Sequence, residues 1–267
     1  MNKLQRYISI RAARNISSKI LSGDLINKVI AKSKFNIPVI IVSFNNGTYV
    51  KNMVQQLNQR EIVPLVIDNK SSDPDTIKVL DEIALGKAEV VRSKRNLGHL
   101  VGFLDPVYKT LPDVFAYTDP DLQFNPELPD NFLLELAELT DQYKCFKAGM
   151  ALDISNFGEM KKLQSSTTRK YPFYFHKIHD VLDWEAQFWL MPLKHDRLEV
   201  YAAPIDTTFA VYQKKYFHSG DFSKGVRVAG KFSACHLPWF AQFDIISNAE
   251  RKNYIATKDA NTGSWVK

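Results

Sequence analysis

The feature that most constrains the fold is a regular alternation of short apolar runs with segments of helical spacing between residues 39 and 118. The runs at 39–44, 63–67 and 114–118 are almost entirely apolar, as expected of strands covered on both faces. The connections between the segments are short. This order is typical of a mostly parallel, doubly wound α/β sheet flanked by helices, which is the fold class that we predict.

The remaining elements follow from the same periodicities. Further strands are expected at 89–92, 146–154 and 201–212, and helices at 49–58, 76–85, 100–110, 129–140 and 180–190. The predicted organisation has three parts: a basic amphipathic helical extension (1–36), the α/β domain (37–243), and a polar, loosely ordered C-terminal tail (244–267) that closes over a ligand.

A pair of carboxylates follows the third apolar run. Asp119 and Asp121 flank Pro120, which cannot continue a central strand because it lacks an N–H group. Both carboxylates should therefore be exposed at the carboxyl end of the strand, where open α/β sheets bind ligands. Two carboxylates so close repel each other, and Mg²⁺ or Mn²⁺ with substrate phosphate oxygens relieves that repulsion. A turn without a ligand is the alternative reading, because Asp and Pro are common turn residues.

The positive charge of the chain is concentrated at its N-terminus. Of the 35 lysine and arginine residues, eight lie in residues 1–36, which contain one of the 29 acidic residues. The rest of the chain is close to neutral, and we expect no nucleic-acid partner. Apolar residues recur at helical spacing in 2–21 and again in 25–30. Such a basic helix either lies on an anionic membrane surface or packs on the domain with a solvated basic face.

Composition excludes several classes of protein. The sequence contains no run of about 18 uncharged apolar residues, so we expect no helix that spans a bilayer. The first residues lack the apolar segment of a secretory signal. Two cysteines, Cys145 and Cys235, are too few for a disulfide framework. These features predict a cytoplasmic location, with peripheral contact at the inner face of the membrane if the extension binds there.

Four motifs follow the predicted strands in a fixed order. They read Ile-Val-Ser-Phe-Asn at 41–45, Val-Ile-Asp-Asn-Lys-Ser-Ser at 66–72, Arg-Asn-Leu-Gly at 95–98 and Thr-Asp-Pro-Asp at 118–121. In this order and spacing, residues 37–125 resemble the inverting family 2 glycosyltransferases of GT-A fold. One departure is Asn-Lys-Ser at 69–71, where the family often has Asp/Asn, Gly/Asn and Ser, but Asp68 is retained.

The resemblance implies a donor site at the ends of these strands. Asp68 would accept a hydrogen bond from the imide N–H of a uracil or similar base. The other residues of the nucleoside pocket would be Ser43, Phe44, Asn45, Asn96 and Gly98, the last permitting close backbone approach.

The resemblance also implies a metal site. Asp119 and Asp121 would hold Mn²⁺ or Mg²⁺ against the donor diphosphate, and the cation would stabilise charge on the departing nucleoside diphosphate. His236, just ahead of Pro238 and Trp239, is a candidate third ligand, and neutral imidazole suits Mn²⁺ better than Mg²⁺. A buried structural histidine is the alternative.

An inverting transfer also needs a carboxylate that deprotonates the acceptor hydroxyl. The candidates are Asp206 and Glu185, with Asp183 and Asp153 behind them. The aromatic stretch 171–175 either stacks on an acceptor sugar or packs in the core.

We therefore predict a metal-dependent hexosyltransferase of inverting type that uses a nucleotide-diphosphate sugar, in the first instance a UDP-sugar, as donor. Its acceptor would be a glycan or lipid-linked glycan in surface polysaccharide or glycoconjugate synthesis. Two other functions remain open. A nucleotidyltransferase also places carboxylates at strand ends, but it usually carries a Gly-rich basic loop after its first strand, which this sequence lacks. Neither a Gly-x-Gly-x-x-Gly nor a Walker-type loop is found there. A non-catalytic carbohydrate- or partner-binding domain of the same fold is the second alternative.

Overall fold

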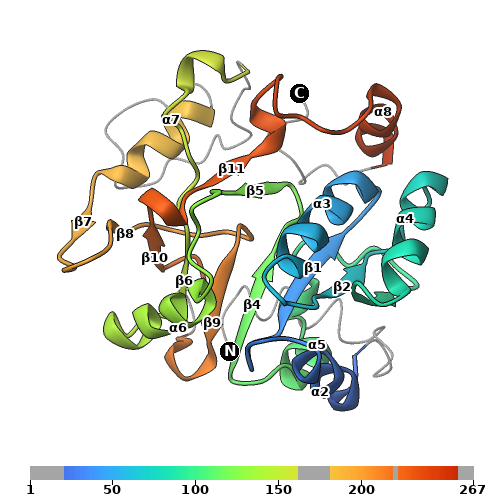
Figure 1. The fold of residues 1–267 in the computed structure, drawn as a ribbon, viewed down its shortest axis with the longest axis horizontal. Helices are drawn as coiled ribbons and strands as arrows, with labels where there is room; N and C mark the ends of the chain where they lie inside the picture. The colour runs from blue at the N-terminus through green and yellow to red at the C-terminus, as the bar shows by residue number, and fades with distance from the viewer. Residues whose placement is uncertain (1–20, 162–180, 219–221, 258–267) are drawn as a thin grey trace.

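The computed structural model describes residues 21–161, 181–218 and 222–257, and Figure 1 shows their arrangement. The strands in these ranges are β1 (Val39–Ser43), β2 (Leu65–Asp68), β3 (Glu89–Arg92), β4 (Val114–Thr118), β5 (Leu122–Phe124), β6 (Lys147–Met150), β7 (Pro192–Leu193), β8 (Val200–Ala202), β9 (Ala210–Gln213), β10 (Val226–Val228) and β11 (Ala234–His236). The α-helices are α2 (Gly23–Ala31), α3 (Gly47–Asn58), α4 (Pro74–Ala84), α5 (Asp105–Thr110), α6 (Phe132–Gln142), α7 (Val181–Ala186) and α8 (Asn248–Thr257).

Within the described ranges, nine strands form one mixed sheet in the order β3-β2-β1-β4-β9-β6-β10-β8-β7. The first four strands of this order are parallel. β9 runs antiparallel between β4 and β6, whereas β10 is parallel to β6. A small second sheet pairs β5 with β11. The predicted α/β class, a mostly parallel sheet flanked by helices, is confirmed.

Side chains of β1 alternate between two hydrophobic cores. Val39 and Ile41 point into the core that includes apolar residues of α3 and α6, while Ile40 and Val42 join the core that includes α2 and α5. All four are buried, and burying one such side chain contributes about 1.5–3 kcal/mol. This two-sided burial explains the near-continuous apolar run, and it holds the carboxyl end of β1 in a fixed place.

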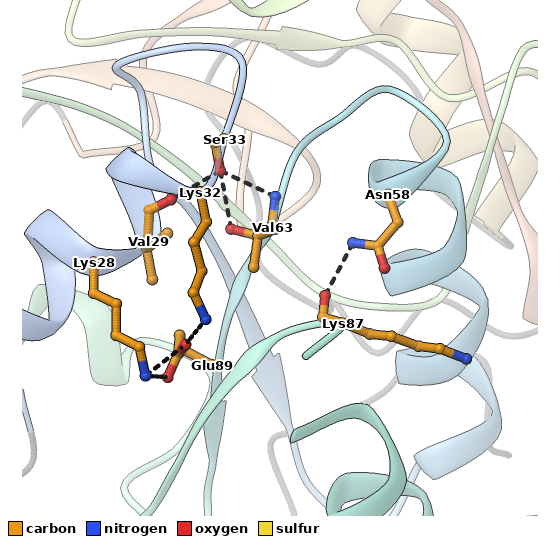
Figure 2. Close-up of polar contacts among 8 residues, drawn as sticks. All are labelled: Lys28, Val29, Lys32, Ser33, Asn58, Val63, Lys87 and Glu89. Carbon is orange, nitrogen blue, oxygen red and sulfur yellow. Dashed lines mark hydrogen bonds and ion pairs between the residues drawn. The ribbon is translucent and has the colours of Figure 1, made fainter. Parts of the chain in front are cut away.

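The described part of the N-terminal extension packs on the domain. Ile26 and Val29 of α2 are buried in the same core as β1. Lys28 and Lys32 both pair with Glu89 at the start of β3, at 2.9 and 2.7 Å (Figure 2). Ser33 donates to the carbonyl of Val29 and accepts from the amide of Val63, as Figure 2 also shows. Residues 1–20, where the rest of the predicted basic helix falls, lie outside the described residues.

Three predicted elements differ from those observed. The helix expected at 100–110 is a 3₁₀ turn, Val101–Phe103, followed by α5, whose first turn contains Pro106 where no intrahelical N–H is needed. The strand expected at 201–212 is divided into β8 and β9 by a turn that contains Pro204. Part of the tail expected to be loosely ordered is α8, which is anchored by hydrogen bonds from Glu250 and Asn253 to the main domain.

The structure also bears on membrane insertion. Among the helices that the structure describes, none is both long and apolar enough to cross a bilayer.

Candidate active site

The ends of β1, β2 and β4 bring the predicted donor-site residues to one edge of the sheet. Ser43 and Asp68 are paired at the last position of the β1–β2 ladder. Asp119 directly follows β4, the neighbour of β1 on its other side. Because these strands are parallel, their carboxyl ends share an edge, which is the usual ligand-binding edge of such sheets.

The carboxylate of Asp68 is buried and held by a neighbouring turn. It accepts hydrogen bonds from the hydroxyl of Ser71 at 2.5 Å and from the Ser71 amide at 3.2 Å. Burial raises the pKa of Asp68, while the Ser71 hydrogen bonds and the more distant Arg92 oppose that rise. A carboxylate has more acceptor positions than this turn uses, so Asp68 retains capacity to accept from a ligand.

Asn45 organises the loops beside Asp68. It has a positive φ of 48°, and its side-chain oxygen accepts from the amides of Ser72 and Asp73 at 2.8 and 3.0 Å. Its amide nitrogen donates to Thr257 of α8 at 2.8 Å. The Asn45 side chain therefore joins the loop after β1 to the loop after β2 and to α8. The Phe44 amide donates to Asn46, which also accepts from the Ser43 hydroxyl.

The turn after β3 is held against the same loops. Asn96 accepts from the amide of Gly98 at 2.9 Å, and Gly98 adopts a φ of 81°, which favours glycine. Asn69 bridges to this turn, donating to the Gly98 carbonyl and accepting from the Leu97 amide. Sequence reasoning named Asn96 and Gly98 but gave Asn69 no role, although its position next to Asp68 was a usable signal.

Asp121 lies against His236, as a metal site at this place requires. Leu122 of β5 is opposite His236 in the β5–β11 ladder, and this register brings the imidazole Nε2 to 3.4 Å from the Asp121 Oδ2 atom. Both residues are buried, so the expectation that Asp121 is exposed is wrong. β11 pairs with β5 next to Asp121, and the Trp239 ring lies against the His236 ring at a tilt of 33°. Asp121 Oδ1 and His236 Nδ1 are buried without a hydrogen-bond partner among the residues that the structure describes.

Asp119 is half-buried and connected to the other half of the sheet. Its amide donates to the carbonyl of Thr207 at 2.9 Å, and its carboxylate accepts a short hydrogen bond from the Thr207 hydroxyl. Burial raises the pKa of Asp119 well above its usual range, and the carboxylates of Asp121 and Asp206 raise it further. Burial lowers the pKa of His236, which favours the neutral imidazole at physiological pH.

The chemistry of this donor set fits a divalent cation. Two carboxylates and a neutral imidazole suit Mn²⁺, and the unpartnered Asp121 and His236 atoms leave acceptor positions open. Across the described ranges, however, no three His, Cys, Asp or Glu side chains are already grouped closely enough to hold a metal. Asp121 and His236 are therefore the adjacent pair, and Asp119 is the third predicted ligand rather than a member of a closed cluster.

The two leading candidates for the base occupy different environments. Asp206 is exposed, in the turn before β9 that also contains Thr207. Glu185 is buried and forms an ion pair with Arg227 at 2.6 Å. Of the two candidates ranked behind them, Asp183 is exposed on α7, and Asp153 accepts from the amide of Ser155 at 2.8 Å. The aromatic stretch 171–175 lies outside the described residues.

Helix α8 is hydrogen-bonded to the segments that follow β1 and β2, and Figure 1 shows it at the upper right, near α3 and α4. Glu250 accepts from the hydroxyl and amide of Thr48 at the start of α3, and Asn253 donates to Asp73 at 2.6 Å. Burial raises the pKa of Tyr254, and the carboxylates of Asp121 and Asp119 raise it further. Sequence reasoning missed Tyr254 and Thr207, because nothing local marks residues that reach the site from distant elements.

The sequence matches the family model described as "Glycosyl transferase family 2" over residues 39–188, more than half of the chain. The chain therefore belongs to glycosyl transferase family 2. The match includes β1, β2, β3 and β4 and the four motifs at or after their ends. No curated protein matches the sequence at a significant level.

Two solved structures that are similar to this chain are a mannosyltransferase and the protein TarS. The mannosyltransferase PcManGT from Pyrobaculum calidifontis, in complex with GDP-Man and Mn²⁺, is 11% identical, with a TM-score of 0.43 over 94% of this chain and 72% of that one. S. aureus TarS 1–349 is 13% identical, with a TM-score of 0.36 over 67% of this chain. The match spans 47% of that TarS chain. At this level of similarity, the family match carries the assignment.

Proposed function

We propose that the protein transfers a sugar from a nucleotide-diphosphate sugar, in the first instance a UDP-sugar, to an acceptor hydroxyl in a metal-dependent, inverting reaction. The observation that carries this proposal is the placement of three carboxylates at the carboxyl ends of β2 and β4, the two strands that flank β1. Asp68 has a partly satisfied, buried carboxylate, whereas Asp119 and Asp121 repel each other beside a neutral imidazole. The first arrangement suits a nucleobase N–H group, and the second suits a cation that neutralises a diphosphate.

Asp119, Asp121 and His236 would hold the cation, Mn²⁺ in preference to Mg²⁺. A cation bound there would act as a Lewis acid toward the diphosphate. The protein side chains supply the rest: Asp68 orients the base, and the turn at Asn96 and Gly98 allows the backbone to approach the nucleoside.

Asp206 is the base that we propose. Its side chain is exposed and lies close enough to the metal end to raise the pKa of Asp119. The alternative, Glu185, accepts a hydrogen bond from Arg227 and is nearly inaccessible to an acceptor. An exposed carboxylate can take the proton of an acceptor hydroxyl, whereas one enclosed in a buried ion pair must first lose its partner.

A donor panel tests the function. Purified protein is incubated with UDP-sugars and GDP-mannose, with Mn²⁺, Mg²⁺ or chelator, and released nucleotide diphosphate is measured. We expect release that requires the divalent cation and increases with a glycan or lipid-linked glycan acceptor. Release of pyrophosphate from sugar phosphate and nucleoside triphosphate would indicate a nucleotidyltransferase instead. Donor binding without any turnover would indicate the non-catalytic binding domain.

We also propose that residues 1–20 hold the enzyme at an anionic membrane surface, where a lipid-linked acceptor of surface polysaccharide or glycoconjugate synthesis would be found. Five of the eight basic residues of the extension lie in this segment. Each contributes about 1 kcal/mol near such a surface, and salt screens the attraction. Because Ile26 and Val29 belong to the core, the truncation that tests this is Δ1–20 rather than Δ1–36. The full chain should sediment with anionic vesicles at low salt, and equal binding by Δ1–20 would contradict the proposal.

A further inference from the structure

Lys147 is a fully buried lysine near the candidate base. It lies at the start of β6, opposite Tyr212 of β9, and has no exposed surface. Its Nζ atom is 3.3 Å from the carbonyl oxygen of Asp206 and 4.1 Å from the ring centroid of Phe222. Lysine is almost never fully buried unless its amine is given partners, because removing the ammonium from water is costly. Here the hydrogen bond of the amine goes to the turn that carries Asp206, while the rings of Phe222 and Tyr212 lie against the ammonium.

That turn, Pro204 to Thr207, is held from both of its ends. Arg227 Nε donates to the carbonyl of Pro204 at 2.9 Å, and the Tyr212 hydroxyl lies 3.3 Å from the same Asp206 carbonyl that Lys147 contacts. Beyond Asp206, the carbonyl of Thr207 accepts from the amide of Asp119. A chain of hydrogen bonds thus runs from the buried lysine, through the turn, to a proposed metal ligand.

The surrounding packing is shaped for the lysine stem. A Cβ atom added to Gly225 would lie 2.8 Å from the Lys147 carbonyl oxygen and 3.0 Å from its Cγ atom. It would also lie 3.3 Å from Ile205 in the turn itself. Any side chain at position 225 would therefore displace either the lysine or the turn, so the two pack together at a fixed distance.

We infer that Lys147 is a positioning residue, which fixes the Pro204–Thr207 turn and thereby holds the Asp206 carboxylate beside Asp119. The inference rests on the proposed function to the extent that Asp206 is the base. Lys147 acts through N–H donation to the Asp206 main chain, and so it acts in either protonation state. Burial lowers the pKa of Lys147 to about 7, as expected of an amine enclosed by aromatic rings, with Asp206 opposing that effect and Arg227 adding to it.

Lys147→Met tests the inference, because it keeps the length of the stem and removes the donor. We expect kcat to fall about 10- to 100-fold, as for a misplaced catalytic group, with the KM for the donor little changed. The backbone amides of Ile205 and Asp119 donate to the carbonyls of Ser223 and Thr207. Hydrogen exchange at these two amides should become faster when the turn is no longer held. Lys147→Gln retains an N–H donor and should recover part of the lost kcat.

Lys214→Met is the matched control. The Lys214 amine also lies over a ring, that of Tyr108, and donates to the carbonyls of Tyr108 and Leu111, but it has no contact with the turn in the described structure. The inference would be overturned if Lys147→Met had the kcat and the amide-exchange rates of the parent protein. It would also be overturned if Lys147→Met and Lys214→Met lost equal amounts of kcat. If the parent protein shows no transfer with any donor, the proposed function fails, while the exchange measurement still decides whether Lys147 holds the turn.

Discussion

The buried charged residues on the strands and strand ends have opposite signs in the two halves of the large sheet. In the half that contains β1, β2 and β4, Asp68 and Asp121 are buried near the carboxyl edge, while β6 and β10 in the other half carry the buried cations Lys147 and Arg227. The cations find their partners within the protein, since Arg227 pairs with Glu185 and both contact the turn before β9. Asp121 instead keeps a buried oxygen without a partner in the described structure.

This difference separates two uses of a buried charge. A charge whose hydrogen bonds are completed by the protein fixes the arrangement of the chain, and removing one partner leaves the other uncompensated. A buried charge whose hydrogen-bonding positions remain open is an exception that needs an explanation. Binding of a ligand of opposite charge is one such explanation. We therefore propose that the half with β6 and β10, called the cationic half, positions Asp206, and that the half with β1, β2 and β4, called the anionic half, binds the ligand.

The largest effect is expected from breaking the buried ion pair. Glu185→Gln leaves the Arg227 guanidinium without its counter-charge, and we expect a loss of about 3–5 kcal/mol in the free energy of unfolding. Urea unfolding measures it. The double variant Glu185→Met with Arg227→Met should recover much of that loss, because neither charge then remains buried. Unchanged stability together with a collapse of kcat would make Glu185, and not Asp206, the base.

Asp121→Asn should produce the next largest effect, on activity rather than stability. It removes a metal ligand, and we expect the rate of transfer to fall about 10²- to 10³-fold, the loss typical of removing one electrostatic stabilising group. Without metal, the variant should melt at a higher temperature than the parent, because Asp121 raises the pKa of Asp119 through repulsion. Stabilisation by Mn²⁺ should be lost.

The exposed Asp130→Asn is the control for Asp121→Asn. It removes one negative charge without touching either carboxylate of the motif. Full activity of Asp121→Asn at limiting Mn²⁺ would remove Asp121 from the metal site.

Much of the anionic half could be predicted from the sequence, because its strands are local apolar runs that end in short polar motifs. The bounds of β3 and β4 are those expected, and the position of Asp119 follows from the end of β4. The strand expected at 63–67 is observed as Leu65–Asp68, so Asp68 is its last residue rather than the residue after it. The cationic half could not be predicted in this way. Glu185 and Arg227 are 42 residues apart, and the β9 register that brings Asp206 to Asp119 depends on long-range antiparallel pairing. Such pairing leaves no period or motif in the local sequence.

Burial of Asp121 was missed for a related reason. Pro120 correctly marks the end of β4, but the chain enters β5 at Leu122 and is covered by β11, more than a hundred residues later. A strand end that looks exposed locally is therefore enclosed by a distant segment. His236 was a candidate from its surroundings alone, and the β5–β11 register explains why it lies beside Asp121.

Asp68→Ala should weaken binding of the nucleoside diphosphate by about 1.5–3 kcal/mol, the value of a hydrogen bond to a charged group. Titration calorimetry measures it, with the exposed Asp75→Ala as the control. Because burial raises the pKa of Asp68, the carboxylate is protonated at a higher pH than an ordinary aspartate, and binding by the parent should weaken as the pH falls through that raised pKa. Equal affinities of parent and variant would make Asp68 a structural residue of the Ser71 turn.

Measured per pH unit, the smallest expected effect is a pH dependence of stability that originates in Lys147. Its pKa is about 7 in the folded protein, against a reference value of 10.5. Between these values the unfolded chain binds a proton that the folded protein does not, so rising pH favours the folded state. The slope is at most about 1.4 kcal/mol per pH unit and disappears above the reference pKa. Below pH 7 the full cost of burying the ammonium is present.

The parent should therefore gain stability relative to Lys147→Met as the pH rises from 7 toward 10.5 in urea titrations. A constant difference between the two proteins across this range would mean that the Lys147 amine keeps its proton when folded, and that the cationic half holds its charge more firmly than its burial implies.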